Sequence, residues 1–385
     1  MSVTAADGFR AAGVPAGIKT GGALDLALVV NDGPHKTAAG VFTRNQVKAA
    51  PVLWSAQVLT GRRLRAVVLN SGGANACTGP GGFQDTHATA ERVAAVLDCG
   101  AVEVAVCSTG LIGERLPLKA VLSGVDTAVA ALAATPEAGL AAATAVLTTD
   151  TVPKQAAVTG AGWTVGGFAK GAGMVAPSLA TMLCVLTTDA AVEEPTLDAV
   201  LRSAVSHTFE RLDIDGTCST NDTVLLLASG ASEVAPDRAE FATAVAQVCH
   251  ELVKGLRADA EGVTKEITIT VRGAADEDEA LAAARAVAQD NLVKTAFFGS
   301  DPNWGRIAAA VGASTATVRA DMLDIQLNGV LLCQGGAVMA DRSKADLSGR
   351  EITVEIDLHL GDGQVTVLTT DLSHGYVEEN SVYSS

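Results

Sequence analysis

Residues 169–184, AKGAGMVAPSLATMLC, join a glycine-rich loop stiffened by Pro177 to a β-like run that starts at Thr181. A threonine hydroxyl at such a junction can attack the carbonyl of the preceding residue if that peptide bond is strained and polarised. The acyl group then moves from nitrogen to oxygen, and water cleaves the ester that results. The stretch therefore predicts self-cleavage between Ala180 and Thr181, which leaves a chain that begins with a free threonine.

An amino-terminal threonine holds two parts of a nucleophilic catalyst in one residue. Its α-amine has a reference pKa of about 8 and can take the proton from its own hydroxyl, so no histidine is required. The alternative interpretation is structural, because an Ala-Thr pair before a strand commonly does no more than end a loop. On these residues by themselves, both interpretations stay open.

Other familiar catalytic motifs are absent from the sequence. It contains no GxxxxGK[ST] phosphate loop, no HExxH zinc helix, no CxxC pair and no GxSxG elbow, and its 6 histidines are dispersed. Any hydrolytic or transfer chemistry therefore needs a nucleophile activated in another way, such as the threonine described above.

Length and charge limit the class of protein. The 385 residues fit one large, two-lobed unit or two domains. The formal net charge of -16, without a Lys/Arg-rich run, disfavours nucleic acid and anionic lipid as partners. We therefore expect neither a nucleic-acid nor a membrane partner.

The distribution of apolar residues and cysteines bears on location. Residues 1–17 show no basic start followed by an apolar run, and the alanine-rich region 127–147 is interrupted by Pro136 and Glu137. The 7 cysteines are odd in number, scattered and mostly inside apolar runs, which favours free buried thiols. We expect a cytoplasmic protein.

Short apolar or β-branched runs between turns predict the strands. The expected strands are Leu64–Asn70, Glu103–Cys107, Met182–Thr188, Thr223–Ala228, Glu266–Val271, Asp324–Leu327, Glu351–Leu358 and Gln364–Thr370. Apolar residues at three- and four-residue steps predict a helix over Arg238–Leu256, and an alanine-rich helix is expected over Glu277–Gln289. The carboxy-terminal half is therefore mixed rather than doubly wound.

Eight further blocks occur in order along nearly the whole chain. They are VFTRN (41–45), AAPV (49–52), NSGGANACTG (70–79), STGLIG (108–113), TTDTVPK (148–154), STNDT (219–223), DPNWGR (301–306) and GYVEEN (375–380). Together with residues 169–184, they make the chain resemble the ornithine acetyltransferase family, the bifunctional glutamate/ornithine N-acetyltransferases of arginine biosynthesis.

The resemblance implies roles for matching residues. Thr181 corresponds to the nucleophile exposed by self-cleavage, which gives an α subunit of residues 1–180 and a β subunit of residues 181–385. Thr109 and Gly110 correspond to the oxyanion hole, and a turn after a strand can aim a hydroxyl and a main-chain N–H at a developing oxyanion. The plainer interpretation of the same residues is a strand-ending turn.

The resemblance also implies a set of substrate contacts. These are Thr148, Lys170, Thr181, Glu261, Asn380 and Ser385. A lysine with hydroxyl and amide donors suits the carboxylate of an amino acid, and Glu261 suits its ammonium group. Taken singly, Lys170 could be a solvated cation, Glu261 a helix-end carboxylate, Asn380 a turn residue and Ser385 a frayed terminus.

The implied reaction is a ping-pong cycle in which Thr181 takes acetyl from N-acetyl-L-ornithine and passes it to L-glutamate. It needs no metal or prosthetic group, and acetyl-CoA is a further candidate co-substrate. The alternatives are an N-terminal-nucleophile amidase or aminopeptidase, in which water is the acyl acceptor, and an uncleaved binding or scaffold protein.

The implied fold is α/β, a layered αββα-type sandwich of mixed sheets (DmpA/ArgJ-like) with a second, smaller C-terminal lobe. Residues 181–275 would complete the main lobe and residues 276–385 would form the smaller one. The two fragments would stay intertwined and pair into an α2β2 heterotetramer.

Two blocks are expected to support the site rather than to react, namely Asn70–Gly79 and Asp301–Arg306, because both are rich in turn residues. The chain departs from the family pattern at Gly73, where asparagine is commoner, and at Thr217-Cys218, where aspartate-threonine is more usual. No proposed catalytic residue is lost, but these departures bear on local geometry and substrate range.

Overall fold

The computed structural model describes residues 2–176 and 182–382, and the chain forms two compact units. The first unit contains Met1–Glu210 and Thr217–Leu256, and the second contains Arg211–Gly216 and Arg257–Ser384. The sequence predicted a smaller lobe that starts at about residue 276. The main segment of the second unit starts earlier, at Arg257. The reason is that β10 (Glu266–Ala274) pairs with β14 and β15 in the sheet of the second unit.

The described part of the first unit contains two mixed sheets. The four-stranded sheet has the order β1-β2-β4-β5, with β1 Phe9–Val14, β2 Leu26–Asn31, β4 Ala66–Asn70 and β5 Val104–Ser108. Of the neighbouring strand pairs in this sheet, β4 and β5 are parallel and the others are antiparallel. The carboxyl ends of β4 and β5 therefore lie at the same edge of the sheet.

The five-stranded sheet has the order β3-β9-β8-β7-β6. Its strands are β3 Thr37–Phe42, β6 Lys154–Thr159, β7 Thr164–Lys170, β8 Leu183–Thr188 and β9 Thr223–Ala228. Strands β8 and β9 are parallel, and the other neighbouring pairs are antiparallel. All residues of β8 and β9 are buried, as expected for central strands covered on both faces.

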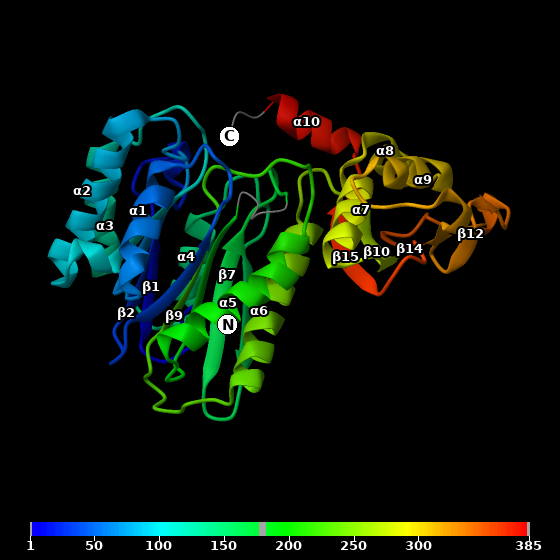
Figure 1. The fold of residues 1–385 in the computed structure, drawn as a ribbon. Coiled ribbons are helices and arrows are strands. Elements are labelled where there is room, and N and C mark those ends of the chain that lie inside the picture. Colours follow the sequence, from blue (N-terminus) through cyan, green and yellow to red (C-terminus); the bar gives the residue numbers. More distant parts are fainter. Residues whose placement is uncertain (1, 177–181, 383–385) are drawn as a thin grey trace. The chain divides into compact units, whose positions relative to one another are not determined.

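Six helices among the described residues belong to the first unit. Their bounds are α1 Ala50–Val58, α2 Gly79–Leu97, α3 Leu118–Ala130, α4 Pro136–Ala145, α5 Glu194–His207 and α6 Arg238–Ala258. Figure 1 shows α1, α2 and α3 beside the four-stranded sheet and α5 and α6 across the five-stranded one. One apolar core contains side chains of both sheets, so the layers run helix, sheet, sheet, helix and the predicted αββα class is confirmed.

Helix α4 packs against strands of both sheets, namely β1, β2, β6 and β7. The approach is close because β1 presents a glycine: a Cβ on Gly13 would lie 2.0 Å from the carbonyl oxygen of Ala141. The buried face of α4 consists of glycine and alanine, including Ala142 and Ala143. Small side chains therefore set the separation of the helix from the sheets.

The second unit is built on a six-stranded sheet in the order β13-β12-β11-β14-β10-β15. The remaining elements are β11 Asp324–Leu327, β12 Val330–Gln334, β13 Ala337–Val338, β14 Glu351–Asp357, β15 Gly363–Thr370, α7 Glu277–Gln289, α8 Asn291–Phe298, α9 Trp304–Ala313 and α10 His374–Val382. Helices α7, α8 and α9 share one apolar core with this sheet. The mixed carboxy-terminal half is thus as predicted.

Short 3₁₀ turns complete the described chain. They are η1 Thr20–Gly22, η2 Leu59–Gly61, η3 Ala101–Glu103, η4 Phe209–Arg211, η5 Ala320–Met322 and η6 Arg342–Lys344.

We expect Gly13→Ala to destabilise the first unit, because the new methyl group would overlap the main chain of α4. Overpacking of this kind lowers the free energy of unfolding by roughly 1–3 kcal/mol. Urea denaturation of the variant measures the loss. Gly61→Ala is the control, since a Cβ on Gly61 meets nothing within 4 Å; equal midpoints for the two variants would contradict the packing argument.

Candidate active site

The turn after β5 is held by the segment that follows β4. The N–H of Thr109 donates to the carbonyl of Asn70 at 3.0 Å, and the Ser108 hydroxyl donates to Asn70 Oδ1 at 2.6 Å. The N–H of Gly73 in turn donates to the carbonyl of Thr109 at 3.0 Å. The block Asn70–Gly79 thus supports the predicted oxyanion turn directly.

Gly110 can only be glycine in this turn. Its φ is +125°, and a Cβ there would lie 2.6 Å from the nitrogen of Gly73. Its N–H donates to no described residue, and the Thr109 hydroxyl has Lys170 as its partner among the described residues. A hydroxyl proton and a main-chain N–H are therefore both available to an oxyanion.

Lys170, the last residue of β7, brings three of the predicted site residues together. Its side chain is 1% exposed, and Nζ lies 2.8 Å from Thr148 Oγ1 and 3.3 Å from Thr109 Oγ1. The interpretation of Lys170 as a solvated surface cation is therefore wrong. Buried ammonium groups require compensating charge or hydrogen bonds, and the threonine hydroxyls supply part of that compensation.

Asp150 supplies the opposite charge. Its carboxylate lies 2.5 Å from Lys154 Nζ and 3.6 Å from Lys170 Nζ, and it accepts the N–H of Gly171 at 2.7 Å. Burial by itself would raise the pKa of Asp150, but Lys170 and Lys154 lower that pKa to about 2. Asp150 is therefore ionised at neutral pH and fixes both lysines.

Met182, which directly precedes β8, is held by the end of the loop before β9. Thr181 itself, together with Ala180 and Ser385, lies outside the described residues. Met182, which follows Thr181 in the chain, donates its N–H to Asp222 Oδ1 at 3.0 Å and accepts from the N–H of Thr223 at 3.0 Å. Burial raises the pKa of Asp222 well above its ordinary value, which favours the neutral acid.

Glu261 and Asn380, the remaining predicted contacts, meet in the second unit. Asn380 Nδ2 donates to Glu261 Oε2 at 2.8 Å and to the carbonyl of Tyr376 at 3.0 Å. Asn380 belongs to α10, so the interpretation as a simple turn residue is wrong. The carboxylate retains lone pairs for an ammonium group.

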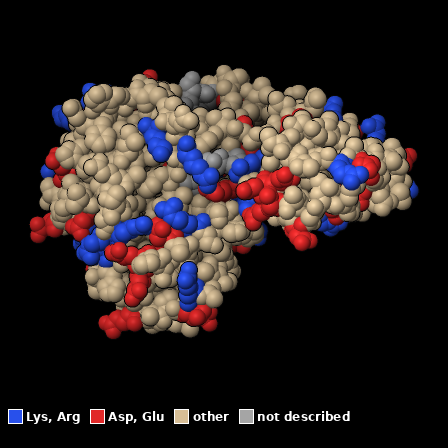
Figure 2. All heavy atoms as spheres, in the orientation of Figure 1, with Lys and Arg blue, Asp and Glu red and all other residues tan. Residues whose placement is uncertain are grey.

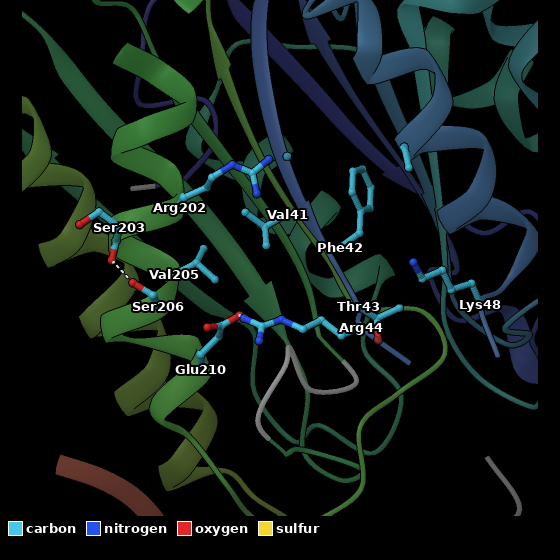
Figure 3. A pocket seen from close by; sticks show the side chains of 12 residues that line it. Val41, Phe42, Thr43, Arg44, Lys48, Arg202, Ser203, Val205, Ser206 and Glu210 are labelled. Carbon is cyan, nitrogen blue, oxygen red and sulfur yellow. Dashed lines mark hydrogen bonds and ion pairs between the residues drawn. The ribbon is translucent and has the colours of Figure 1, made fainter. Parts of the chain in front are cut away.

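A groove of about 800 Å³ lies between β3 and α5 of the first unit (Figure 3). Arg44, Lys48 and Arg202 line it, and Arg44 Nη2 lies 2.6 Å from Glu210 Oε1. Thr43, another lining residue, donates its hydroxyl to the carbonyl of Ser219 at 2.6 Å. The groove thus borders the loop that contains Asp222.

Charges of both signs are interspersed on the face drawn in Figure 2. Within residues 2–176 and 182–382, no helix is long and apolar enough to cross a membrane, and no group of His, Cys, Asp or Glu side chains is arranged to hold a metal ion. All seven cysteines are free; four are buried, whereas Cys77 is exposed and Cys99 and Cys218 are half-buried. The expectation of buried thiols therefore holds for four of them.

Several residues of this site were not assigned roles from the sequence. Asp150 and Lys154 stand in the block TTDTVPK, and Asn221 and Asp222 stand in STNDT. A carboxylate four residues before a lysine is a weak signal for an ion pair. The contacts of Asn221 and Asp222 join segments far apart in sequence, so local spacing gives no signal for them.

Comparison with known proteins identifies the family. The model of the ArgJ family matches residues 10–385. The arginine biosynthesis bifunctional protein ArgJ of Mycolicibacterium paratuberculosis is 63% identical over 100% of this chain and 97% of its own length, and that of Thermobifida fusca is 57% identical over 100% of both. The fold and site define an α/β enzyme built for acyl transfer. The chain belongs to the ArgJ family, which confirms the predicted family and the prediction of an enzyme of arginine biosynthesis.

Solved structures include similar chains. Ornithine acetyltransferase of Mycobacterium tuberculosis, complexed with ornithine, is 67% identical over 46% of this chain and 95% of that chain, with a TM-score of 0.46. The arginine biosynthesis bifunctional protein ArgJ of Bacillus halodurans is 34% identical over 51% of this chain and 97% of that chain, with a TM-score of 0.49.

We expect Asp150→Asn to lower the free energy of unfolding by roughly 3–5 kcal/mol at pH 7, because Lys154 and Lys170 lose their buried counter-charge. Since the folded-state pKa is depressed, the contribution of Asp150 is full above its unfolded pKa of about 4 and is lost as the pH falls toward 2. Thermal unfolding at pH 7 and at pH 3 measures both effects.

Asp198→Asn is the matched control, because Asp198 also lies between two cations, Arg62 and Arg202, but at the surface. Its loss should stay below about 1 kcal/mol. Equal losses in the two variants would show that burial of the Asp150 cluster is unimportant.

Proposed function

We propose that this chain cleaves itself before Thr181 and then moves an acetyl group from N-acetyl-L-ornithine to L-glutamate through an acetyl ester on Thr181. The observation that supports this most directly is the turn of Thr109 and Gly110, whose hydroxyl proton and main-chain N–H donate to no described residue. The buried Lys170 beside Thr109 places a fixed positive charge at the same position.

Self-cleavage begins when Thr181 Oγ attacks the carbonyl carbon of Ala180. The C–N bond breaks as the acyl group moves to oxygen, and the amine takes up a proton. Water then hydrolyses the ester, which yields residues 1–180 with a free carboxylate and residues 181–385 with a free α-amine.

Acetyl transfer uses the same oxygen. The α-amine takes the hydroxyl proton while Oγ attacks the acetyl carbon of N-acetylornithine, and Thr109 and Gly110 stabilise the oxyanion. Collapse breaks the C–N bond, and the proton passes to the departing amine of ornithine. The amine of glutamate then attacks the ester, which forms N-acetylglutamate and restores Thr181. Groups of the chain supply all of this chemistry, so no metal or prosthetic group takes part.

Substrate recognition follows from the charges. Lys170 and Thr148 provide donors for a substrate carboxylate, and the Glu261–Asn380 pair of the second unit provides an acceptor for an ammonium group. Ser385 is carried over as a further contact. We propose that the fragments of two chains assemble as α2β2.

Thr181→Ala should remove both self-cleavage and acetyl transfer. Intact-mass spectrometry of the wild type should give two fragments, residues 1–180 and residues 181–385. The variant should give one chain of 38.8 kDa. An intact wild-type chain would support a scaffold role instead. Hydrolysis of acetylornithine that outpaces transfer to glutamate would support an amidase.

We propose acetyl-CoA as a second acetyl donor, because the groove beside Thr43 offers Arg44, Lys48 and Arg202 to phosphate groups. Lys48→Glu should raise the KM for acetyl-CoA about tenfold and leave the KM for N-acetylornithine unchanged. Lys119→Glu, an exposed charge reversal on α3, is the control. Wild-type protein that forms no acetyl-Thr181 from acetyl-CoA would disprove this second donor.

A further inference from the structure

The loop Ser219–Asp222 contacts both halves of the proposed catalytic centre. Asn221 and Asp222 are neighbours in this loop, and their side chains are 4% and 0% exposed. We infer that these two residues position the reaction: Asn221 holds the turn of Thr109 and Gly110, Asp222 holds Met182, which follows the nucleophile in the chain, and their adjacency in one loop links the two contacts. This inference rests on the proposed function.

Asn221 binds the oxyanion side. Its Nδ2 donates to the carbonyl of Ser108 at 2.8 Å and to the carbonyl of Ala74 at 2.6 Å. Ser108 directly precedes Thr109, and Ala74 donates its own N–H to the carbonyl of Leu111 at 2.9 Å. The amide group of Asn221 therefore holds both the segment that precedes Gly110 in the chain, at Ser108, and the segment that is hydrogen-bonded to Leu111, at Ala74. The Thr220 hydroxyl donates to Asn221 Oδ1 at 2.5 Å, which orients the amide.

Asp222 binds the nucleophile side. Its Oδ1 accepts the N–H of Met182, the first peptide group after Thr181, at 3.0 Å. This contact needs an acceptor oxygen at the position of Oδ1, which either a carboxyl or an amide group provides.

The loop is anchored from outside by β3 and the residues after it. Thr43 donates its hydroxyl to the carbonyl of Ser219 at 2.6 Å and its N–H to the carbonyl of Asp222 at 3.0 Å. Asn45 Nδ2 donates to the carbonyl of Cys218 at 2.8 Å. Thr43 and Asn45 of the block VFTRN therefore hold the loop in place.

Asn221 and Asp222 have nearly isosteric side chains, but their contacts require a hydrogen-bond donor at residue 221 and an acceptor at residue 222. Asn221 must donate two hydrogen bonds to carbonyls, which a carboxylate cannot do. Asp222 accepts the N–H of Met182 at Oδ1, which an amide oxygen does equally well, while its Oδ2 has the weaker contact at 3.9 Å with the Cys218 thiol. Exchange of acid and amide is therefore harmful at residue 221 and tolerated at residue 222.

The test compares Asn221→Asp, Asn221→Ala, Asp222→Asn and Asp222→Ala as full chains. For each, kcat and KM of acetyl transfer are measured per self-cleaved molecule, and the cleaved fraction is measured by intact mass. We expect kcat to fall about 100-fold in Asn221→Asp and at least about tenfold in Asn221→Ala and Asp222→Ala, with KM nearly unchanged, because misplaced groups cost transition-state stabilisation. Asp222→Asn should keep kcat within about threefold.

Thr187→Val is the matched control. Thr187 is also buried, but it lies at the end of β8 that is far from Met182, and the substitution removes its hydrogen bond to the carbonyl of Val3. It should lose thermal stability but keep kcat. The inference would be overturned if the Asn221 variants kept the wild-type kcat. It would also be overturned if Asp222→Asn were as inactive as Asp222→Ala. A wild type that transfers no acetyl would instead overturn the proposed function.

Discussion

The face-to-face alignment of two sheets is the constraint on which this molecule depends. The turn of Thr109 and Gly110 follows β5 of the four-stranded sheet, whereas Lys170 ends β7 and Met182 directly precedes β8 in the five-stranded sheet. Acyl transfer requires such groups to be held within about 0.5 Å. The small side chains of α4 and the glycine of β1 bring that helix close to the strands, which is consistent with a composition of 48% apolar but only 3% aromatic residues.

Net charge and local charge are separate properties of this chain. The formal charge is -16, yet the most buried ionic cluster holds two lysines and one aspartate. A cluster of that kind costs desolvation free energy, which its mutual attraction and hydrogen bonds must offset. It holds the Lys170 ammonium group at a fixed place beside Thr109, so a local positive charge exists in a protein whose net charge repels anions at long range.

The sequence predicted some elements well and others not at all, for physical reasons. Thr223–Ala228 and Glu277–Gln289 were predicted with the observed bounds, because one is an uninterrupted apolar run and the other has helical periodicity. Strand β7 has two glycines and is buried on both faces, so it shows neither β-branched enrichment nor alternation.

For the site, the blocks of the resemblance indicated Thr109, Gly110, Thr148 and Lys170. They could not indicate what Asn221 does, because its partner Ser108 is 113 residues away in the chain.

The strand order of the five-stranded sheet has a consequence for a chain cut after residue 180. Strands β8 and β9 would then belong to one fragment, but they lie between β3 on one side and β7 and β6 on the other, which belong to the other fragment. The fragment with β3, β7 and β6 would flank the two central strands of the other fragment on both sides, so dilution would not separate them as it separates ordinary subunits. The pieces could part only by breaking the hydrogen bonds of β9 with β3 and of β8 with β7, so the cut would create two new termini while leaving the five-stranded sheet intact.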